Sequence, residues 1–354
     1  MSISAVLQTA HASGVHAVER ELAALHAEML HLGGEEAVRL SVLTLVIMCQ
    51  DEAGVELAER TVEFLSGSHP ARAIVILSNA GASQRIDADL SLRCTATNAG
   101  QICTEQVRLT VAGAGTGHLS SIVQPLLVPD VPVYVWLLVG PDALPAITED
   151  IASISPYVII DSNAAADSAS SIVHLASEQQ RLGDRLCLLD LAWASTRRWR
   201  ELTAQAFDGK DVRPFLNHID QVDVECSGDS VTSAGWLIAG WLEDRAREGG
   251  SNPTVGVRAL RNGAAPHGEL AGLRLRCSLD GGAASIAVQR RQQVLQTHID
   301  IDGGVTALRA LPMPALDTVH LLGITLEETV RDTVYQRSLR AAAELIAGMG
   351  AGRG

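Results

Sequence analysis

The first candidate for chemistry in this 354-residue chain is a glycine-rich run, Gly113-Ala-Gly115-Thr-Gly117-His118, between a predicted strand and a predicted helix. In that setting backbone amides and a helix N-terminus can bind a phosphate group. The run lacks the later glycine of the dinucleotide fingerprint, and the sequence has no Gly-Lys-Ser/Thr of a P-loop. A tight turn is therefore favoured. The alternative is a sugar-phosphate or nucleotide-binding enzyme that uses residues 113–118 together with His69 and Arg72.

A second set of polar residues could be combined on paper into a hydrolytic site. Ser120 or Ser121, together with His118 and Asp161, have the types of a nucleophile, a base and an orienting acid. No Gly-x-Ser-x-Gly elbow supports this arrangement, and serine before a helix is more often a cap. We therefore expect no catalytic residues and no cofactor.

The six cysteines are spread along the chain with neither a Cys-x-x-Cys pair nor a Cys/His spacing typical of metal sites, so we expect no metal. Cys94 and Cys103 differ from the others because they bracket a predicted hairpin loop. They could face each other across the hairpin, within reach of a disulfide. We take this pair as the redox candidate, although paired cysteines are rare in a reducing cytoplasm.

Tryptophan is concentrated in one part of a chain that is only 3% aromatic. Trp193 and Trp199 lie close to Arg197, Arg198 and Arg200 in the sequence. Tryptophan and arginine are among the residues that dominate protein-binding hot spots. Core packing of the indoles is the competing interpretation. We predict that the exposed members of a set contact a partner protein: Trp193, Arg197, Trp199, Arg200 and Trp241.

These residues must be positioned by alternating strands and helices. Residues 1–34 read as a helix, residues 39–49 and 72–78 as buried strands, and residues 55–65 as the helix between them. Residues 90–97 and 105–111 predict an antiparallel hairpin, residues 118–127 a helix, and residues 196–207 the helix with the tryptophans. The fold class is therefore α/β, with a mixed, largely parallel sheet and flanking helices.

The pattern changes after Asp208. Short alternating strands, with Asp-Gly turns at residues 280–282 and 302–304, precede closing helices from residue 316 onward. This order is typical of an α+β domain. We predict an N-terminal α/β domain over residues 1–212 and a C-terminal α+β domain over residues 213–354.

Charge and composition exclude several classes of partner. The formal net charge is −14, which disfavours nucleic acid and anionic membrane surfaces because both require clustered basic residues. No stretch is long and apolar enough to span a membrane. The N-terminus lacks the basic start and apolar core of a signal peptide. The sequence thus predicts a cytoplasmic protein.

Several runs together resemble the glucose-6-phosphate dehydrogenase assembly protein family, OpcA. They follow one another over most of the chain, and the clearest are Ser68-His69-Pro70-Ala71-Arg72, Cys103-Thr-Glu105, Asp161-Ser162, Asp190-Leu-Ala-Trp193, Trp199-Arg200, Gly240-Trp241 and Arg331-Asp-Thr-Val-Tyr335.

The resemblance implies a non-enzymatic protein that binds glucose-6-phosphate dehydrogenase, favours its active oligomer and activates it allosterically in the oxidative pentose phosphate pathway. It implies no catalytic residues. For some members of the family, the resemblance also implies redox control through thioredoxin. In this chain that role would fall by default on Cys94 and Cys103. Two hypotheses compete with the activator, namely the phosphate-binding enzyme described above and a scaffold for another enzyme of carbon metabolism.

Overall fold

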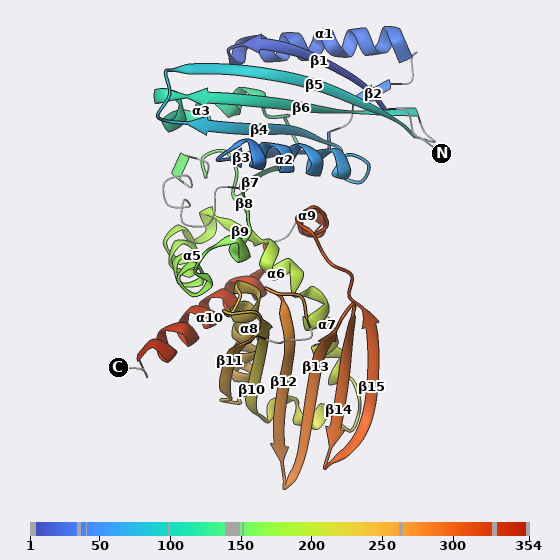
Figure 1. Cartoon of the computed structure of the whole chain (residues 1–354), viewed down its shortest axis with the longest axis vertical. Coiled ribbons are helices and arrows are strands. Elements are labelled where there is room, and N and C mark those ends of the chain that lie inside the picture. The colour runs from blue at the N-terminus through green and yellow to red at the C-terminus, as the bar shows by residue number, and fades with distance from the viewer. Residues whose placement is uncertain are drawn as a thin grey trace. The chain divides into compact units, whose positions relative to one another are not determined.

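The computed structural model describes residues 5–33, 37–39, 41–97, 100–138, 149–150, 152–261, 265–327 and 331–351. The chain divides into two compact units (Figure 1). The first contains residues 1–160 and 184–189, and the second contains residues 161–183 and 190–354. Within the described ranges, no helix combines the length and the apolar character that crossing a bilayer requires.

The first unit is built on a mixed sheet, as the sequence predicts. Among the described residues its strand order is β1-β5-β6-β4-β3-β7-β8-β9, and β2 also pairs with β6. The strands are β1 (Ala5–Ser13), β2 (Ala37–Arg39), β3 (Leu43–Cys49), β4 (Ala71–Asn79), β5 (Arg85–Thr97), β6 (Gly100–Ala112), β7 (Val133–Leu138), β8 (Tyr157–Ile160) and β9 (Cys187–Asp190). The pairs β3–β4, β4–β6, β3–β7 and β7–β8 are parallel, whereas β1–β5 and β5–β6 are antiparallel.

Helices cover this sheet. Helix α1 (Val15–Gly33) packs on β1 and β5, and α2 (Glu52–Leu65) packs on β4 and β3. Helix α2 begins where the Asp51 side chain accepts a hydrogen bond from the amide of Gly54, an N-cap. All seven residues of β3 are buried, as expected of a central parallel strand that is covered on both faces.

Two predictions in the first unit are wrong. Residues 1–34 do not form one helix, because residues 5–13 are the strand β1 and α1 starts only after Gly14, whose φ is +82°. Long-range pairing with β5 outweighs local helical periodicity there. The helix predicted over residues 118–127 is instead a five-residue helix, α3 (Leu119–Val123), between the 3₁₀ turns η1 (Gly113–His118) and η2 (Gln124–Leu126).

The second unit combines a six-stranded sheet with helices. The strand order is β11-β10-β12-β13-β14-β15, in which only β10–β11 is a parallel pair. The strands are β10 (Ile219–Ser227), β11 (Thr254–Leu260), β12 (Leu270–Leu279), β13 (Gly282–Arg291), β14 (Val294–Ile301) and β15 (Gly304–Pro312). The described helices include α5 (Ser168–Leu182), α6 (Leu191–Ser195), α7 (Arg197–Ala206), α8 (Ser233–Glu248), α9 (Thr318–Glu327) and α10 (Thr333–Ala351).

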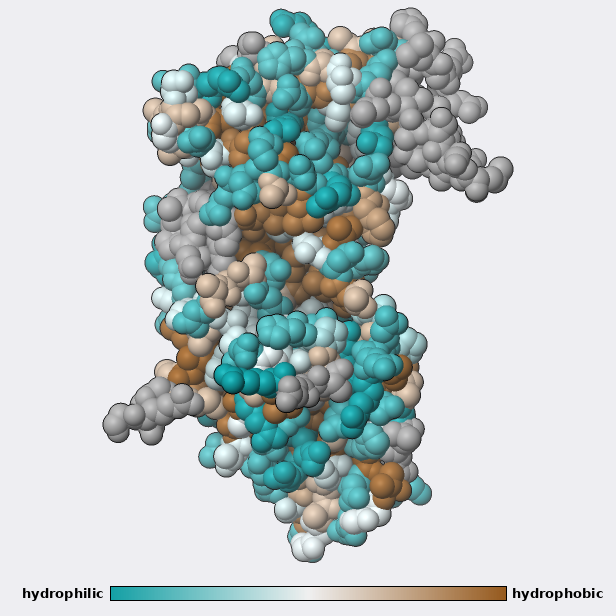
Figure 2. Space-filling model, in the orientation of Figure 1, coloured by the Kyte–Doolittle hydropathy of each residue, from teal (hydrophilic) through white to brown (hydrophobic). Residues whose placement is uncertain are grey.

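The predicted turns of this sheet have the required backbone conformation. Asp280 and Gly281 have φ values of 50° and 85°, and Asp302 and Gly303 have φ values of 52° and 83°. Positive φ at both central residues is the condition for a tight hairpin turn. The second unit's surface in the view of Figure 2 is mostly hydrophilic, with apolar residues in small separate patches.

The boundary between the two compact units lies earlier in the chain than the boundary predicted from the sequence. Residues 190–212 belong to the second unit, so the proposed boundary between residues 212 and 213 falls inside it. The reason is packing, since α6 contacts α9 and the ring of Trp193 contacts that of Tyr335 in α10. The segment with the tryptophans is thereby tied to the C-terminal part of the chain.

Candidate functional site

The tryptophan segment of the second unit begins at a buried carboxylate. The side chain of Asp190 caps α6 and is 3% exposed. Its Oδ1 accepts hydrogen bonds from the amides of Ala192 (3.0 Å) and Ser162 (3.1 Å), and its Oδ2 accepts from the hydroxyls of Ser162 (2.7 Å) and Tyr335 (3.3 Å). Burial raises the pKa of Asp190 to about 6. This carboxylate holds three separate segments of the unit together.

Trp193 is the centre of the same cluster. Its indole Nε1 donates a 2.6 Å hydrogen bond to Oδ2 of Asp332, and the guanidinium carbon of Arg200 lies 3.8 Å from its ring centroid. The ring of Tyr335 lies 5.9 Å away, centroid to centroid. Trp193 is only 3% exposed. Trp193 and Arg200, both predicted to contact a partner, are brought together; Trp193 is buried, whereas Arg200 lies over its ring and is half-buried.

The other members of the predicted set differ in exposure. Trp199 is 1% exposed on α7, the helix that packs on β13 and β14. Arg197 on the same helix is exposed and forms a 3.1 Å ion pair with Glu201. Trp241, on α8, is half-buried. Arg197 is therefore the exposed member, and Arg200 and Trp241 are partly accessible.

Cys94 and Cys103 lie directly opposite each other on β5 and β6 and are joined by a disulfide. Their Cα atoms are 4.0 Å apart, and the two residues are 1% and 2% exposed. Two loop residues that the sequence places between the strands, 98 and 99, lie outside the described residues. The other four cysteines, Cys49, Cys187, Cys226 and Cys277, are buried free thiols.

The sequence did not reveal that Arg72 belongs to a buried ion-pair cluster. Its Nε donates a 2.6 Å hydrogen bond to Oε2 of Glu105, and its Nη1 donates to Glu19 and, at 2.9 Å, to the carbonyl of Leu126. Nε2 of His26 lies 2.6 Å from the other oxygen of Glu105. An arginine inside the apolar run of β4 was the available signal, because a buried charge requires a partner.

The phosphate-binding alternative does not fit this geometry. The guanidinium of Arg72 is committed to carboxylates, and residue 72 pairs with Glu105 at one end of β4 while Asn79 pairs with Ala112 at the other end. The turn at residues 113–118 follows Ala112, so about seven residues of strand, roughly 23 Å, separate it from Arg72. At Gly113, whose φ is +69°, a Cβ atom would lie 2.9 Å from Cα of Gln84. The positive φ and the close approach of Gln84 therefore explain why residue 113 is a glycine, without a bound phosphate.

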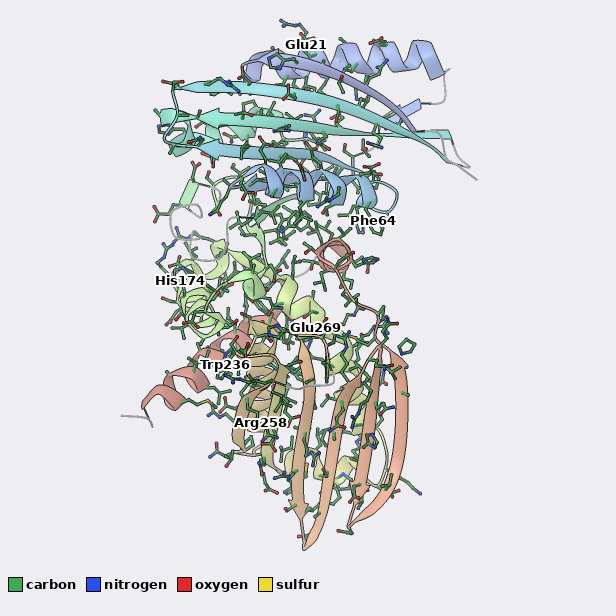
Figure 3. All side chains as sticks on the ribbon, in the orientation of Figure 1. Glu21, Phe64, His174, Trp236, Arg258 and Glu269 are labelled. Atoms are coloured by element: carbon green, nitrogen blue, oxygen red, sulfur yellow. A yellow bond between two sulfur atoms is a disulfide. The ribbon has the colours of Figure 1, made fainter. Side chains whose placement is uncertain are left out.

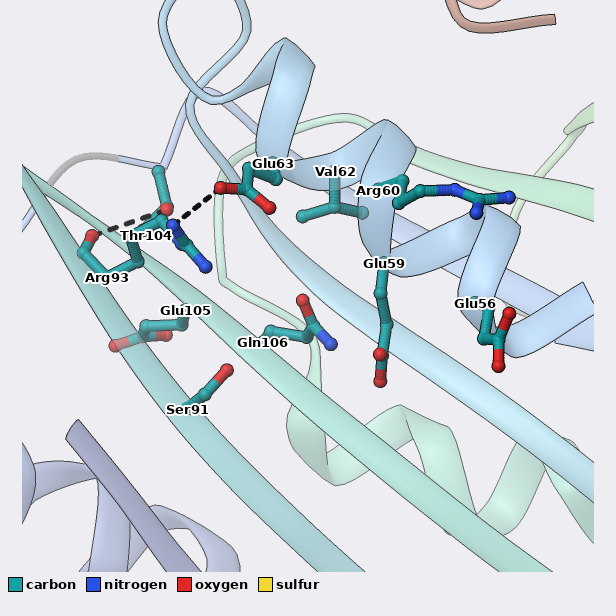
Figure 4. A pocket seen from close by; sticks show the side chains of 10 residues that line it. All are labelled: Glu56, Glu59, Arg60, Val62, Glu63, Ser91, Arg93, Thr104, Glu105 and Gln106. Atoms are coloured by element: carbon teal, nitrogen blue, oxygen red, sulfur yellow. Dashed lines mark hydrogen bonds and ion pairs between the residues drawn. The ribbon is translucent and has the colours of Figure 1, made fainter. Parts of the chain in front are cut away.

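The first unit contains a cavity of about 490 Å³ between α2 and the strands β5 and β6 (Figure 4). From α2, the side chains of Glu59 and Glu56 point toward the strands, and Glu63 forms a 2.7 Å ion pair with Arg93. The exposed ring of Phe64, labelled in Figure 3, follows on the same helix. Among the described residues, no group of three or more His, Cys, Asp or Glu side chains is arranged to bind a metal ion. Ser91 and Gln106 add neutral polar groups to the lining.

Comparison with known proteins gives matches along most of the chain. The glucose-6-phosphate dehydrogenase subunit N-terminal domain matches residues 62–177, and the corresponding C-terminal domain matches residues 187–339. A protein of Synechocystis sp. that carries the provisional name OxPP cycle protein OpcA is 26% identical over 304 residues, which are 78% of this chain and 63% of that protein. A relative from Nostoc punctiforme with the same provisional name is 26% identical over 189 residues, 52% of this chain and 40% of the relative.

The chain thus spans less than two thirds of the length of these relatives. Among solved structures, an oxidoreductase domain protein from Kribbella flavida is similar with a TM-score of 0.38 and 11% identity, over 89% of this chain and 98% of that chain. The two domain matches follow each other in order and cover residues 62–177 and 187–339. They show that the chain belongs to the OpcA family of glucose-6-phosphate dehydrogenase assembly proteins.

Proposed function

We propose that this protein is a non-enzymatic partner of glucose-6-phosphate dehydrogenase that acts in the cytoplasm, favours the active oligomer of that enzyme and raises its activity. The observation that carries this proposal is the pair of domain matches, both described as domains of a glucose-6-phosphate dehydrogenase subunit. A binding role agrees with the positions of the residues that the sequence offered for phosphate binding. Arg72 is ion-paired inside the fold, and residues 113–118 form a turn.

Activation without chemistry requires only a difference in affinity. An activator must bind the competent state of the dehydrogenase more tightly than the less active state, and a coupling free energy of about 1 to 3 kcal/mol changes an affinity roughly 5- to 150-fold. A standard protein interface of about 1,600 Å² can supply such a difference. The surface of this chain, 16,798 Å² in total, has room for it.

The test is a rate measurement on the dehydrogenase of the same organism. Initial rates are recorded over a range of glucose 6-phosphate concentrations, with and without equimolar amounts of this protein. A lower apparent KM or a higher kcat is expected. If the rates are unchanged and no complex forms in sedimentation, the proposed function is wrong. Retrieval of a different enzyme of carbon metabolism in a pull-down would instead favour a scaffold.

The partner surface is proposed to include Arg197. Replacing Arg197 by alanine should weaken binding to the dehydrogenase about 5- to 30-fold, or about 1 to 2 kcal/mol, without changing the melting temperature. Arg20→Ala on α1, which removes another largely exposed arginine (76% of its side chain), is the matched control. Equal affinities for these two variants would remove α7 from the interface. Arg200→Ala is a poorer test because that arginine covers Trp193.

The disulfide is proposed as a redox switch of the activation. Reduction would break the bond between Cys94 and Cys103, with two electrons and two protons supplied by a dithiol protein such as thioredoxin. Because both cysteines are buried, the end of the β5–β6 hairpin must open first. We expect activation to differ between oxidising and reducing conditions for the unmodified protein. The Cys94→Ser/Cys103→Ser variant should give one level of activation in both, and a retained difference would contradict the switch.

A further inference from the structure

The disulfide between Cys94 and Cys103 lies on the face of the first sheet that α1 covers. Glu105 follows Cys103 by two residues on β6, and it points to the same side of the sheet because side chains alternate along a strand. Its Oε1 lies 2.6 Å from Nε2 of His26 on α1. Cys94 is directly opposite Cys103 on β5, so both sulfur atoms are on the α1 side. On that side the helix screens the bond from solvent.

The strand register shows how far α1 extends over this face. β1 ends at Ser13, opposite Asp87 on β5, and α1 then runs back alongside β1 (Figure 1). His26 on α1 is level with Leu92, the residue of β5 opposite the partner of that histidine on β6. Cys94 lies about 7 Å farther along β5. α1 continues to residue 33, seven residues beyond His26, which adds about 10 Å. The last turn of the helix therefore lies at the level of the disulfide.

Strand β2 protects the edge of β6 next to the disulfide. β4 pairs with β6 from Glu105 onward, whereas β2 pairs with residues 101–103 of β6, where Arg39 is the partner of Cys103. β2 also follows α1 closely in the chain, since α1 ends at Gly33 and β2 begins at Ala37. The helix thus covers the face of the sheet at the disulfide, and the strand covers the edge. We call α1 and β2 together the clamp.

Polar and apolar contacts fasten the helix of the clamp to the sheet. His26, whose side chain is 17% exposed, pairs with the fully buried Glu105, and Glu19 pairs with Arg72 about two turns earlier. Among the described side chains of α1, the buried apolar ones all precede His26, namely Val18, Leu22 and Leu25. The contact of His26 is therefore the described one nearest the disulfide. Loss of this contact should release the end of the helix before the rest.

We propose that the clamp gates the disulfide: the end of α1 must lift before a reductant can reach Cys94 or Cys103, because the β5–β6 hairpin cannot open beneath a docked helix. A thiolate of a dithiol then attacks one sulfur, which forms a mixed disulfide and releases the other cysteine. The second thiol displaces the first cysteine, so the dithiol leaves as a disulfide and its two protons pass to the cysteines. Access to the bond depends on α1 whether or not the redox state alters activation, so this inference stands apart from the proposed function.

The rate of reduction by dilute dithiothreitol tests the gate. Samples are quenched in denaturant with an alkylating agent, and mass spectrometry counts the two additional alkylated cysteines. Ala27→Gly, at an exposed position of α1, loosens the helix by about 1 kcal/mol. It should raise the rate about fivefold, because the reductant reacts with the open form. Arg60→Gly makes the matched change at an exposed position of α2, the helix that packs on β3 and β4, and should leave the rate unchanged.

A second variant and a second measurement identify the opening. His26→Gln removes the ion pair nearest the disulfide and should raise the reduction rate about tenfold. Hydrogen exchange of the last amides of α1 in the oxidised protein should accelerate by the same factor as reduction in each variant. Equal acceleration of reduction by Ala27→Gly and Arg60→Gly would mean that the whole unit must unfold. Faster exchange of α1 without faster reduction would mean that the hairpin opens independently of the helix. Either result would overturn the gate.

Discussion

Replacing Arg72 by alanine is expected to lower the free energy of unfolding of the first unit by about 3 to 5 kcal/mol. Arg72 is 2% exposed and Glu105 is fully buried, so the substitution leaves a carboxylate without its guanidinium in the interior. Burial alone would lower the pKa of Arg72, but Glu105 and Glu19 raise it above its ordinary value. The two carboxylates therefore stabilise the charged form of Arg72 against the effect of burial. Urea denaturation followed by circular dichroism measures the loss.

Two further variants separate this pair from a general effect of losing an arginine. Arg85→Ala removes an arginine whose side chain is 63% exposed and pairs with Asp87, so its cost should stay below about 1 kcal/mol. The double variant Arg72→Met/Glu105→Leu should recover part of the stability, because an apolar pair avoids the cost of burying charge. If Arg72→Ala costs no more than Arg85→Ala, the buried pair contributes nothing measurable.

Much of the fold could be predicted because its signals are local. The apolar run at β3 predicts a buried strand, which the structure shows. The Asp-Gly pairs at residues 280–281 and 302–303 predict hairpin turns, and both pairs have the positive φ values of such turns. Strand β1 was missed because its state depends on β5, about 80 residues later in the chain. Its own residues have no strong alternation to mark a strand. Long-range pairing of this kind leaves no trace in a short window.

The candidate interface was harder to predict because tryptophan and arginine serve both cores and contacts. The hydrogen-bond partner of Trp193, Asp332, lies 139 residues later in the chain. No residue near Trp193 in the sequence indicates that Asp332 is its hydrogen-bond partner. Arg197 and Arg200 are only three positions apart on α7, yet one is exposed and the other covers an indole ring. Cys94 and Cys103 could be paired from the sequence because a short hairpin fixes their relation locally.

Replacing Trp193 by alanine should destabilise the second unit by about 3 to 5 kcal/mol, the usual cost of removing a buried large aromatic side chain. The change removes a 2.6 Å hydrogen bond to Asp332 and the ring on which Arg200 lies. Trp193→Phe keeps an aromatic ring but not the indole N–H, so it should cost less, about 1 to 2 kcal/mol, from the lost hydrogen bond and the smaller ring together. Trp241→Ala, at a half-buried indole, should cost less than Trp193→Ala.

Two compact units allow two unfolding transitions, since such chains need not unfold in a single step. Arg72→Ala should shift the transition of the first unit and Trp193→Ala that of the second. A shift of the same transition by both variants would contradict the division of the chain. Because a buried indole cannot reach a partner directly, the activation proposed above predicts the same rate increase of the dehydrogenase with folded Trp193→Phe as with the unmodified protein. Lost activation with intact folding would show instead that this cluster opens when the partner binds.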